Sequence, residues 1–254
     1  MELVTVDLVP VDNEKNVAKV VLNDPERRNA LSQPMVERIV TVFDELESQP
    51  EVNAVVLTGA PPAFCAGADL AELEGVSRET LKPIYEGFLR IARSPLPTIA
   101  AVNGPAVGAG INLALVCDLR IAGRRARFSA RFLGLGLHPG GGNTWLLQQI
   151  GGSQLATAMT LFGEVLNGEA AAERGLVWRV VDDEELIPTA LKLAEFAASA
   201  PPALVQELKK TLRDLPGIDS HADAVEREYQ SQAWSVEQPF FAERIAALRQ
   251  RIQS

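Results

Sequence analysis

The hydrophobic positions in the first half of the chain follow two different periods. Short runs rich in β-branched residues predict buried strands, and the stretches between them place apolar residues at helical spacing. The predicted strands cover residues 17–22, 54–57, 98–102, 119–121 and 126–130, and the predicted helices cover residues 35–46 and 109–116. Because strands and helices alternate, the sequence predicts a layered α/β core rather than a β-sandwich.

From Thr144 onward the pattern becomes helical. The predicted helices cover residues 145–150, 155–162, 187–200, 204–212, 221–234 and 240–252. The last two are amphipathic, and an apolar helix face of this kind packs on its own domain or on a partner subunit. We therefore expect an α/β core over residues 1–195 and a helical region over residues 196–254 that serves oligomerisation and covers a pocket.

The composition narrows the class of protein. A chain of 254 residues with 47% hydrophobic content can bury one large core, and its formal net charge of −9 argues against a nucleic-acid partner. No stretch approaches the roughly 20 apolar residues of a membrane span, and the N-terminus lacks the apolar region of a secretion signal. Two cysteines and two histidines without metal-like spacing suggest a reducing compartment and no metal site, so we expect a cytoplasmic protein.

Two loops of small residues each follow a β-type run. They are Ala66-Gly67-Ala68-Asp69 and the stretch 103–110, in which Gly108 and Gly110 flank Ala109 at a predicted helix N-terminus. Unpaired N–H groups and the positive end of a helix dipole favour an anionic oxygen. Two such loops can form an oxyanion hole, where losing one donor costs ~3 kcal/mol of barrier. Taken singly, each loop is more typical of a tight turn than of an oxyanion hole.

Five motifs occur in one order and spacing along nearly the whole chain: residues 24–31, 66–69, 103–110, 117–120 and 135–142. Together they resemble the enoyl-CoA hydratase/isomerase family, also called the crotonase superfamily. The resemblance implies the ClpP/crotonase type of α/β fold, with a repeated ββα core and a helical C-terminal region. It also implies an acyl-CoA thioester as ligand, so that coenzyme A is part of the substrate rather than a cofactor, and assembly as a homotrimer or a dimer of trimers.

The same resemblance assigns roles to individual residues. It implies that the amides of Ala66 and Ala109 hold the thioester carbonyl, although the family usually has glycine at the second position. Contacts to coenzyme A are expected from the loop over residues 27–31, from the stretch that begins at Ala66 and from the C-terminal helix. These residues are Arg27, Arg28, Ala30, Ala66, Gly67, Ala68, Asp69, Leu70 and Arg251.

The chain departs from the family where acid–base chemistry is expected. Hydratases of the family use two glutamates, and their positions hold Asn112 and Phe132 here, while the carboxylate position of some isomerases holds Gly140. An amide cannot take up a proton, and a phenyl ring excludes water. Because a general acid or base contributes ~10²–10⁴-fold, we expect ordinary hydration to be weak or absent.

Several readings stay open at this point. His138 lies beside Pro139 near the expected acyl pocket, and histidine is suited to proton transfer near neutral pH, so a divergent isomerase or lyase using His138 is one alternative. A non-catalytic acyl-CoA-binding protein is another. Cys65 as a nucleophile, and Ser129 with His138 as a peptidase pair, receive no support from the motifs. Phe132 and Leu137 are expected to lie nearest the acyl group.

Overall fold

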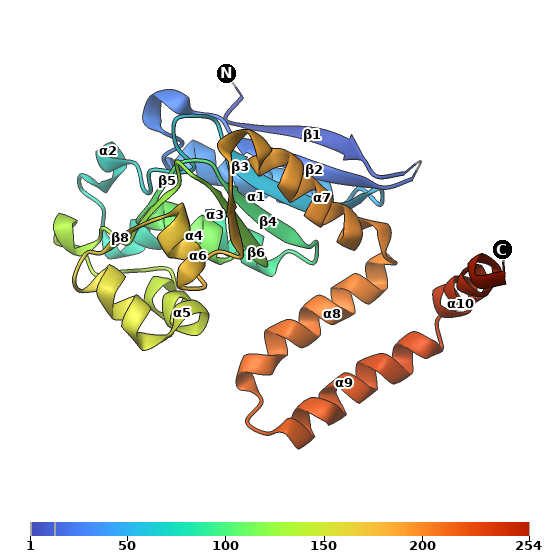
Figure 1. The fold of residues 1–254 in the computed structure, drawn as a ribbon. Coiled ribbons are helices and arrows are strands. Elements are labelled where there is room, and N and C mark those ends of the chain that lie inside the picture. Colours follow the sequence, from blue (N-terminus) through green and yellow to red (C-terminus); the bar gives the residue numbers. More distant parts are fainter. Residues whose placement is uncertain (1, 13, 254) are drawn as a thin grey trace. The chain divides into compact units, whose positions relative to one another are not determined.

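The computed structural model describes residues 2–12 and 14–253. The chain divides into two compact units, Met1–Ala198 and Ser199–Ser254. Strands and helices alternate through the first unit, and the second unit is built from helices (Figure 1).

The strands lie at β1 Val4–Pro10, β2 Asn16–Leu22, β3 Val52–Gly59, β4 Thr98–Val102, β5 Pro105–Val107, β6 Leu119–Gly123, β7 Arg127–Ser129, β8 Val165–Asn167 and β9 Arg179–Val181. The helices lie at α1 Gln33–Glu47, α2 Leu70–Leu73, α3 Arg78–Arg93, α4 Ala109–Leu115, α5 Asn143–Thr160, α6 Gly168–Glu173, α7 Leu186–Ser199, α8 Pro202–Asp214, α9 His221–Val236 and α10 Pro239–Gln253. The predicted mixed α/β class with a helical C-terminal region is confirmed.

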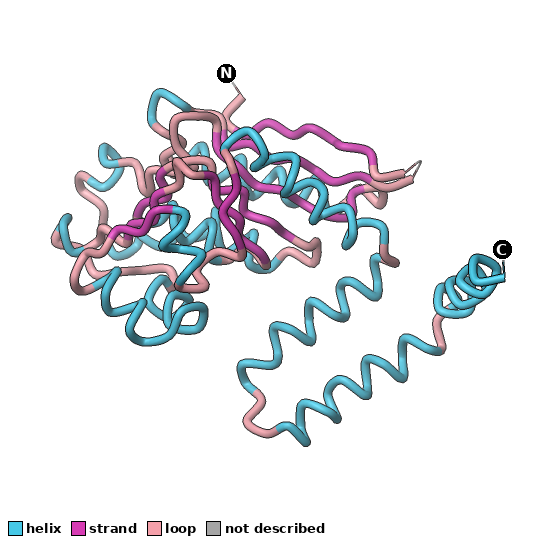
Figure 2. The backbone as a smooth tube through the Cα atoms, viewed as in Figure 1, coloured by secondary structure: helices cyan, strands magenta, loops and turns pink. Residues whose placement is uncertain are grey.

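Two sheets organise the first unit (Figure 2). In the described chain the larger has the strand order β1-β2-β3-β4-β6-β9, with an antiparallel β1–β2 pair and parallel pairing from β2 onward. The smaller has the order β5-β7-β8. Strand β3 is buried at every position, as expected for a parallel strand covered on both faces.

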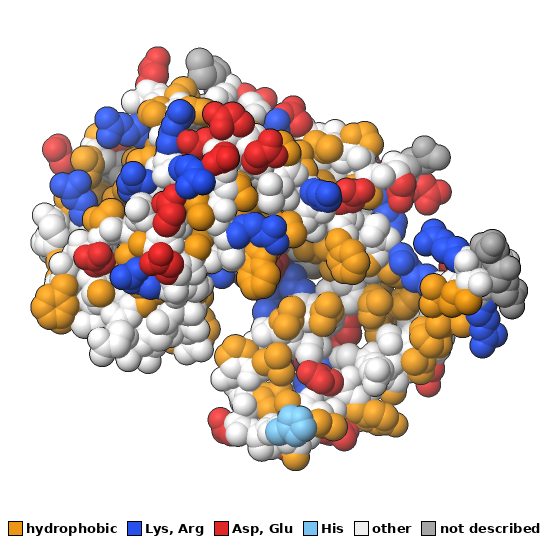
Figure 3. All heavy atoms as spheres, in the orientation of Figure 1, with side chains coloured by type: hydrophobic (Ala, Val, Ile, Leu, Met, Phe, Trp, Pro, Cys, Tyr) orange, Lys and Arg blue, Asp and Glu red, His pale blue; other side chains and the backbone are white. Residues whose placement is uncertain are grey.

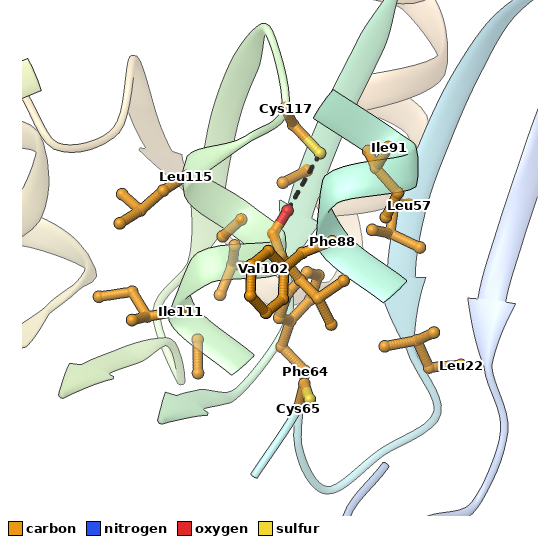
Figure 4. Close-up of a cluster of buried hydrophobic side chains, with 14 of the residues drawn as sticks. Leu22, Leu57, Phe64, Cys65, Phe88, Ile91, Val102, Ile111, Leu115 and Cys117 are labelled. Carbon is orange, nitrogen blue, oxygen red and sulfur yellow. Dashed lines mark hydrogen bonds between the residues drawn. The ribbon is translucent and has the colours of Figure 1, made fainter. Parts of the chain in front are cut away.

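The core lies on both faces of the larger sheet. Alternate residues of one strand belong to different clusters: Val55 and Leu57 of β3 pack with α1, α3 and α4, whereas Ala54 and Val56 pack with α7. Figure 4 shows part of the first cluster, where the Cys117 thiol donates to the Leu113 carbonyl at 3.3 Å. Successive side chains of a strand point to opposite faces of the sheet, so β3 packs against helices on both sides.

Helix α4 is fixed at its C-terminal end by a half-buried arginine. The guanidinium of Arg120 donates to the carbonyls of Leu115 at 3.3 Å and Cys117 at 2.8 Å, and also to that of Leu176 at 2.8 Å. Burial lowers the pKa of Arg120 from its ordinary value. A cation at this end complements the helix dipole, so Arg120 helps to hold the helix whose other end begins at Ala109.

Within the second unit, ion pairs and ring contacts join consecutive helices. Arg227 of α9 pairs with Glu207 of α8 at 3.2 Å and with Asp214 at 2.9 Å, and the Trp234 and Phe240 rings lie 6.2 Å apart. Hydrophobic side chains appear along the surface of these helices (Figure 3). In the described part of the chain, no helix has the length and apolar character needed to cross a membrane.

Candidate active site

Asn29 anchors the loop between β2 and α1. Its side chain is fully buried, and Nδ2 donates to the carbonyls of Ala60 at 2.9 Å and Ala63 at 2.8 Å, while Oδ1 accepts from Asp24 N at 2.9 Å. Arg28 and Asn29 both adopt positive φ, at 53° and 56°. Sequence reasoning gave Asn29 no role, although asparagine is a residue that tolerates this backbone conformation.

The structure changes which amide of the first small loop can serve a ligand. Ala66 N donates to Arg28 O at 3.0 Å, so this amide is already used and the assignment of Ala66 as a carbonyl donor is wrong. The amides of Ala68 and Ala109 donate to no residue in the described ranges. The two N–H groups available to a ligand are therefore those of Ala68 and Ala109. The sequence could not show that the Ala66 amide is used, because its acceptor, the Arg28 carbonyl, is distant in sequence.

The two small loops meet backbone to backbone. A Cβ built on Gly67, whose φ is 98°, would lie 2.6 Å from Val107 O and 3.5 Å from Ala109 N. A Cβ on Gly110 would collide with the Cys65 carbonyl. The residue before Ala68 thus touches the start of α4, which brings the two unused amides to the same place.

A cavity of about 700 Å³ opens over these amides. It brings together eleven residues singled out from the sequence: Arg27, Arg28, Ala30, Ala66, Gly67, Ala68, Asp69, Leu70, Ala109, Phe132 and Leu137. It also includes Gly108, Arg131 and Leu135, and five residues to which sequence reasoning gave no role: Glu26, Ala71, Glu72, Leu73 and Val107. Glu26 and Val107 fall inside recognised motifs, which was the available signal for them.

The charges around the cavity are partly compensated. Arg27 pairs with Asp69 at 3.4 Å, and Asp69 also accepts from Ala71 N at 2.9 Å at the start of α2. Arg28 and Arg131 form no ion pair with any residue in the described ranges. These two guanidinium groups can therefore meet an anionic ligand without first breaking a salt bridge.

Asn112 is held in a buried amide network. Nδ2 donates to Gly140 O at 3.0 Å, and Oδ1 accepts from Asn143 Nδ2 at 2.8 Å. Both asparagines are 1% exposed. The Asn112 side chain thus reaches the loop before α5, and it is not among the residues that line the cavity. Phe132, by contrast, is buried in the cavity wall.

Two sequence candidates are not among the residues that line this cavity. His138 is exposed, its Nδ1 is 2.7 Å from Pro139 O, and it does not line the cavity. Arg251 is an exposed residue of α10 in the second unit. Neither the His138 nor the Arg251 side chain therefore forms part of the cavity wall. Within the described ranges, no three His, Cys, Asp or Glu side chains lie together as a metal site would require.

Comparisons with known proteins agree with the motifs. A model of the enoyl-CoA hydratase/isomerase family matches residues 12–238. A Mycobacterium tuberculosis protein named "Probable enoyl-CoA hydratase EchA14" is 46% identical over 254 residues, covering 96% of this chain and 98% of that protein. The 1,2-epoxyphenylacetyl-CoA isomerase of Escherichia coli is 37% identical over 233 residues, or 87% of each chain. The crystal structure of an enoyl-CoA hydratase from Mycobacterium smegmatis has a TM-score of 0.88 at 30% identity, covering 98% of this chain and 96% of that one.

Asn29 carries the first prediction. Replacing it with alanine leaves the carbonyls of Ala60 and Ala63 without their donor, so we expect Asn29→Ala to lower the free energy of unfolding by ~2–4 kcal/mol in urea denaturation. Asn23→Ala is the matched control, because Asn23 donates to Glu2 O at an exposed position. If Asn29→Ala lowers the free energy of unfolding no more than Asn23→Ala does, the anchoring role of Asn29 is contradicted.

The cysteines carry the second prediction. Burial raises the pKa of the Cys65 thiol to about 12, so almost none of it is thiolate at pH 8, and Cys117 is buried as well. We expect neither thiol to react with an aromatic disulfide reagent in the folded protein, and both to react after denaturation. Fast labelling of Cys65 in the native state would show that this loop is more open than the structure indicates.

Proposed function

The chain belongs to the enoyl-CoA hydratase/isomerase family, and we propose that its cavity binds a CoA thioester and stabilises negative charge on the thioester oxygen. The observation that carries the proposal is the pair of unused amides, Ala68 and Ala109, at the contact between the two small loops. Donors fixed in this way stabilise an enolate-like oxygen without reorganising during the reaction. Small side chains at both positions leave room for a thioester to approach the backbone.

The coenzyme A part belongs, in this proposal, on the side of the cavity formed by residues 26–30 and 66–73. Arg28, which has no ion pair within the described chain, is the first candidate for a phosphate, and Arg27 is the second because Asp69 competes for it. The assignment of Arg251 to the same ligand stays a prediction from the resemblance. The acyl group extends toward Phe132, Leu135 and Leu137, an apolar wall suited to a fatty or aromatic acyl chain.

We infer that the reaction moves a proton rather than adds water. Asn112 cannot accept a proton, and its amide is already bonded to Gly140 and Asn143. Phe132 occupies the cavity wall where a second carboxylate would be needed. Isomerisation of an acyl-CoA through an enolate-like intermediate is therefore favoured over hydration, and an isomerase of 1,2-epoxyphenylacetyl-CoA is among the relatives.

The alternative is a protein that binds acyl-CoA without turnover. The loss of both glutamates is the observation that favours it. An isomerase or lyase that uses His138 has less support, because this exposed ring faces the Pro139 carbonyl rather than the cavity. An assay for turnover of an acyl-CoA by the purified protein distinguishes these two functions, because only an enzyme would convert the ligand.

Assembly and compartment belong to the same proposal. A homotrimer or dimer of trimers would give the exposed apolar side chains of the second unit, such as Leu208, Leu212 and Phe241, a surface to pack against. Two free, buried cysteines suit the reducing cytoplasm.

The third prediction tests the oxyanion donors. Ala109 is the first residue of α4, a position that tolerates proline, so Ala109→Pro removes one N–H while keeping the helix. We expect the infrared carbonyl stretch of ¹³C-labelled crotonyl-CoA to fall in frequency on binding to the wild type, and to fall less in the variant. Any turnover should drop ~10²-fold or more. Ala109→Gly keeps the amide and should match the wild type; an equal shift in all three proteins would overturn the assignment.

The fourth prediction concerns hydration. We expect the wild-type protein to consume the conjugated absorbance of crotonyl-CoA at least a few hundredfold more slowly than a hydratase of the family, because a missing acid and base cost ~10²–10⁴-fold each. The double variant Asn112→Glu with Phe132→Glu should gain hydratase activity. Asn112→Gln with Phe132→Gln is the size-matched control without carboxylates. Fast hydration by the wild type, or an equal gain in both double variants, contradicts the interpretation.

A further inference from the structure

The hydroxyl of Tyr85 fills the space that a side chain at residue 140 would need. A Cβ built on Gly140 would collide with Tyr85 Oη and lie 3.1 Å from Cζ. Tyr85 belongs to α3, is half-buried, and its ring packs on Phe88 with the ring centroids 5.6 Å apart. Its hydroxyl forms no hydrogen bond with any residue in the described ranges, whereas a tyrosine hydroxyl in such a setting usually has a partner.

This hydroxyl lies next to the polar network that begins below the proposed carbonyl donors. Asn112 follows Ala109 by three residues of α4, a rise of about 4.5 Å along the helix, and the two residues share one helix face. Asn112 Nδ2 reaches Gly140 O at 3.0 Å, and Gly140 is the residue that Tyr85 Oη touches. A series of contacts thus joins the Ala109 turn to Tyr85, although neither Asn112 nor Tyr85 is among the residues that line the cavity.

Tyr85 is the member of this cluster that can exchange a proton. The side-chain amides of Asn112 and Asn143 do not ionise, and Gly140 contributes backbone alone. A phenol both donates and accepts hydrogen bonds, and tyrosine serves as a general acid or base. The cluster also contains a second unused polar atom, because Asn143 Oδ1 is buried and has no hydrogen-bond partner in the described chain.

We propose that the Tyr85 hydroxyl is the proton-transfer group of this site, an inference that rests on the proposed thioester-binding function. The Tyr85 O–H bond breaks as its proton forms a C–H bond at the α-carbon of the thioester enolate. The enolate electron pair makes that bond, the carbonyl C=O re-forms, and the phenolate takes a proton from water. In the reverse direction the phenolate removes the α-proton while the amides of Ala68 and Ala109 hold the developing negative charge.

The test is hydrogen exchange at the α-carbon of butanoyl-CoA in D₂O, followed by ¹H NMR. This saturated thioester cannot be hydrated, so the signal reports proton transfer alone. We expect Tyr85→Phe to slow the catalysed exchange ~10²-fold or more. The calorimetric Kd for butanoyl-CoA should stay within twofold, since phenylalanine keeps the ring packing on Phe88. Tyr229→Phe, which changes the chain's other tyrosine on α9, is the control and should exchange like the wild type.

A second measurement keeps the hydroxyl in place. In the Tyr229→Phe background Tyr85 is the single tyrosine, so 3-fluorotyrosine incorporated throughout the chain alters its acidity alone. An exchange rate that changes threefold or more on fluorination supports proton transfer by Tyr85.

Three results would overturn the inference. Exchange by Tyr85→Phe within twofold of the wild type is one, and an unchanged rate on fluorination is another. A wild-type protein that binds butanoyl-CoA without catalysing exchange is the third, and it leaves the binding function intact. Failure to bind any acyl-CoA is a different result, because it removes the proposed function itself and this inference with it.

Discussion

The contact between the loop around Gly67 and the start of α4 is the constraint on which the site depends. At Gly67 and Gly110 a Cβ would strike the carbonyls of Val107 and Cys65, so the two backbones can approach only where both residues are glycine. This approach places the Ala68 and Ala109 amides together without using either of them internally. The fold thereby maintains two unsatisfied donors, which is unfavourable unless a ligand oxygen or water satisfies them.

Other parts of the core keep that contact in place. Asn29 fastens the loop that carries Arg28, and the Arg28 carbonyl accepts from Ala66 N, so the orientation of the next two peptides follows from a side chain buried elsewhere. Arg120 fixes the opposite end of α4 through the Leu115 and Cys117 carbonyls. The amide of Ala109 is therefore positioned from both ends of a helix that is only two turns long.

The sequence predicts those elements whose hydrophobic period is unambiguous. The predicted strand over 98–102 matches β4, and the helix over 109–116 matches α4 to within one residue. Helix α3 escapes prediction because Pro83 and many charged residues mask the apolar positions that pack on the core. Motif spacing locates the two small loops, but which amide is free depends on the Arg28 carbonyl, a contact between residues 38 positions apart. The hydrophobic period and the motif spacing are properties of neighbouring residues. A contact between distant residues, such as that of Ala66 with Arg28, leaves no trace in either of them.

Tyr85 has no local signal at all, because its significance comes from a partner 55 residues away. In this structure its hydroxyl occupies the place of a Cβ at residue 140, so a side chain there would require the tyrosine hydroxyl to move. An acid missing from one element can be compensated by a polar group from another, and residue-by-residue comparison of motifs cannot detect that exchange.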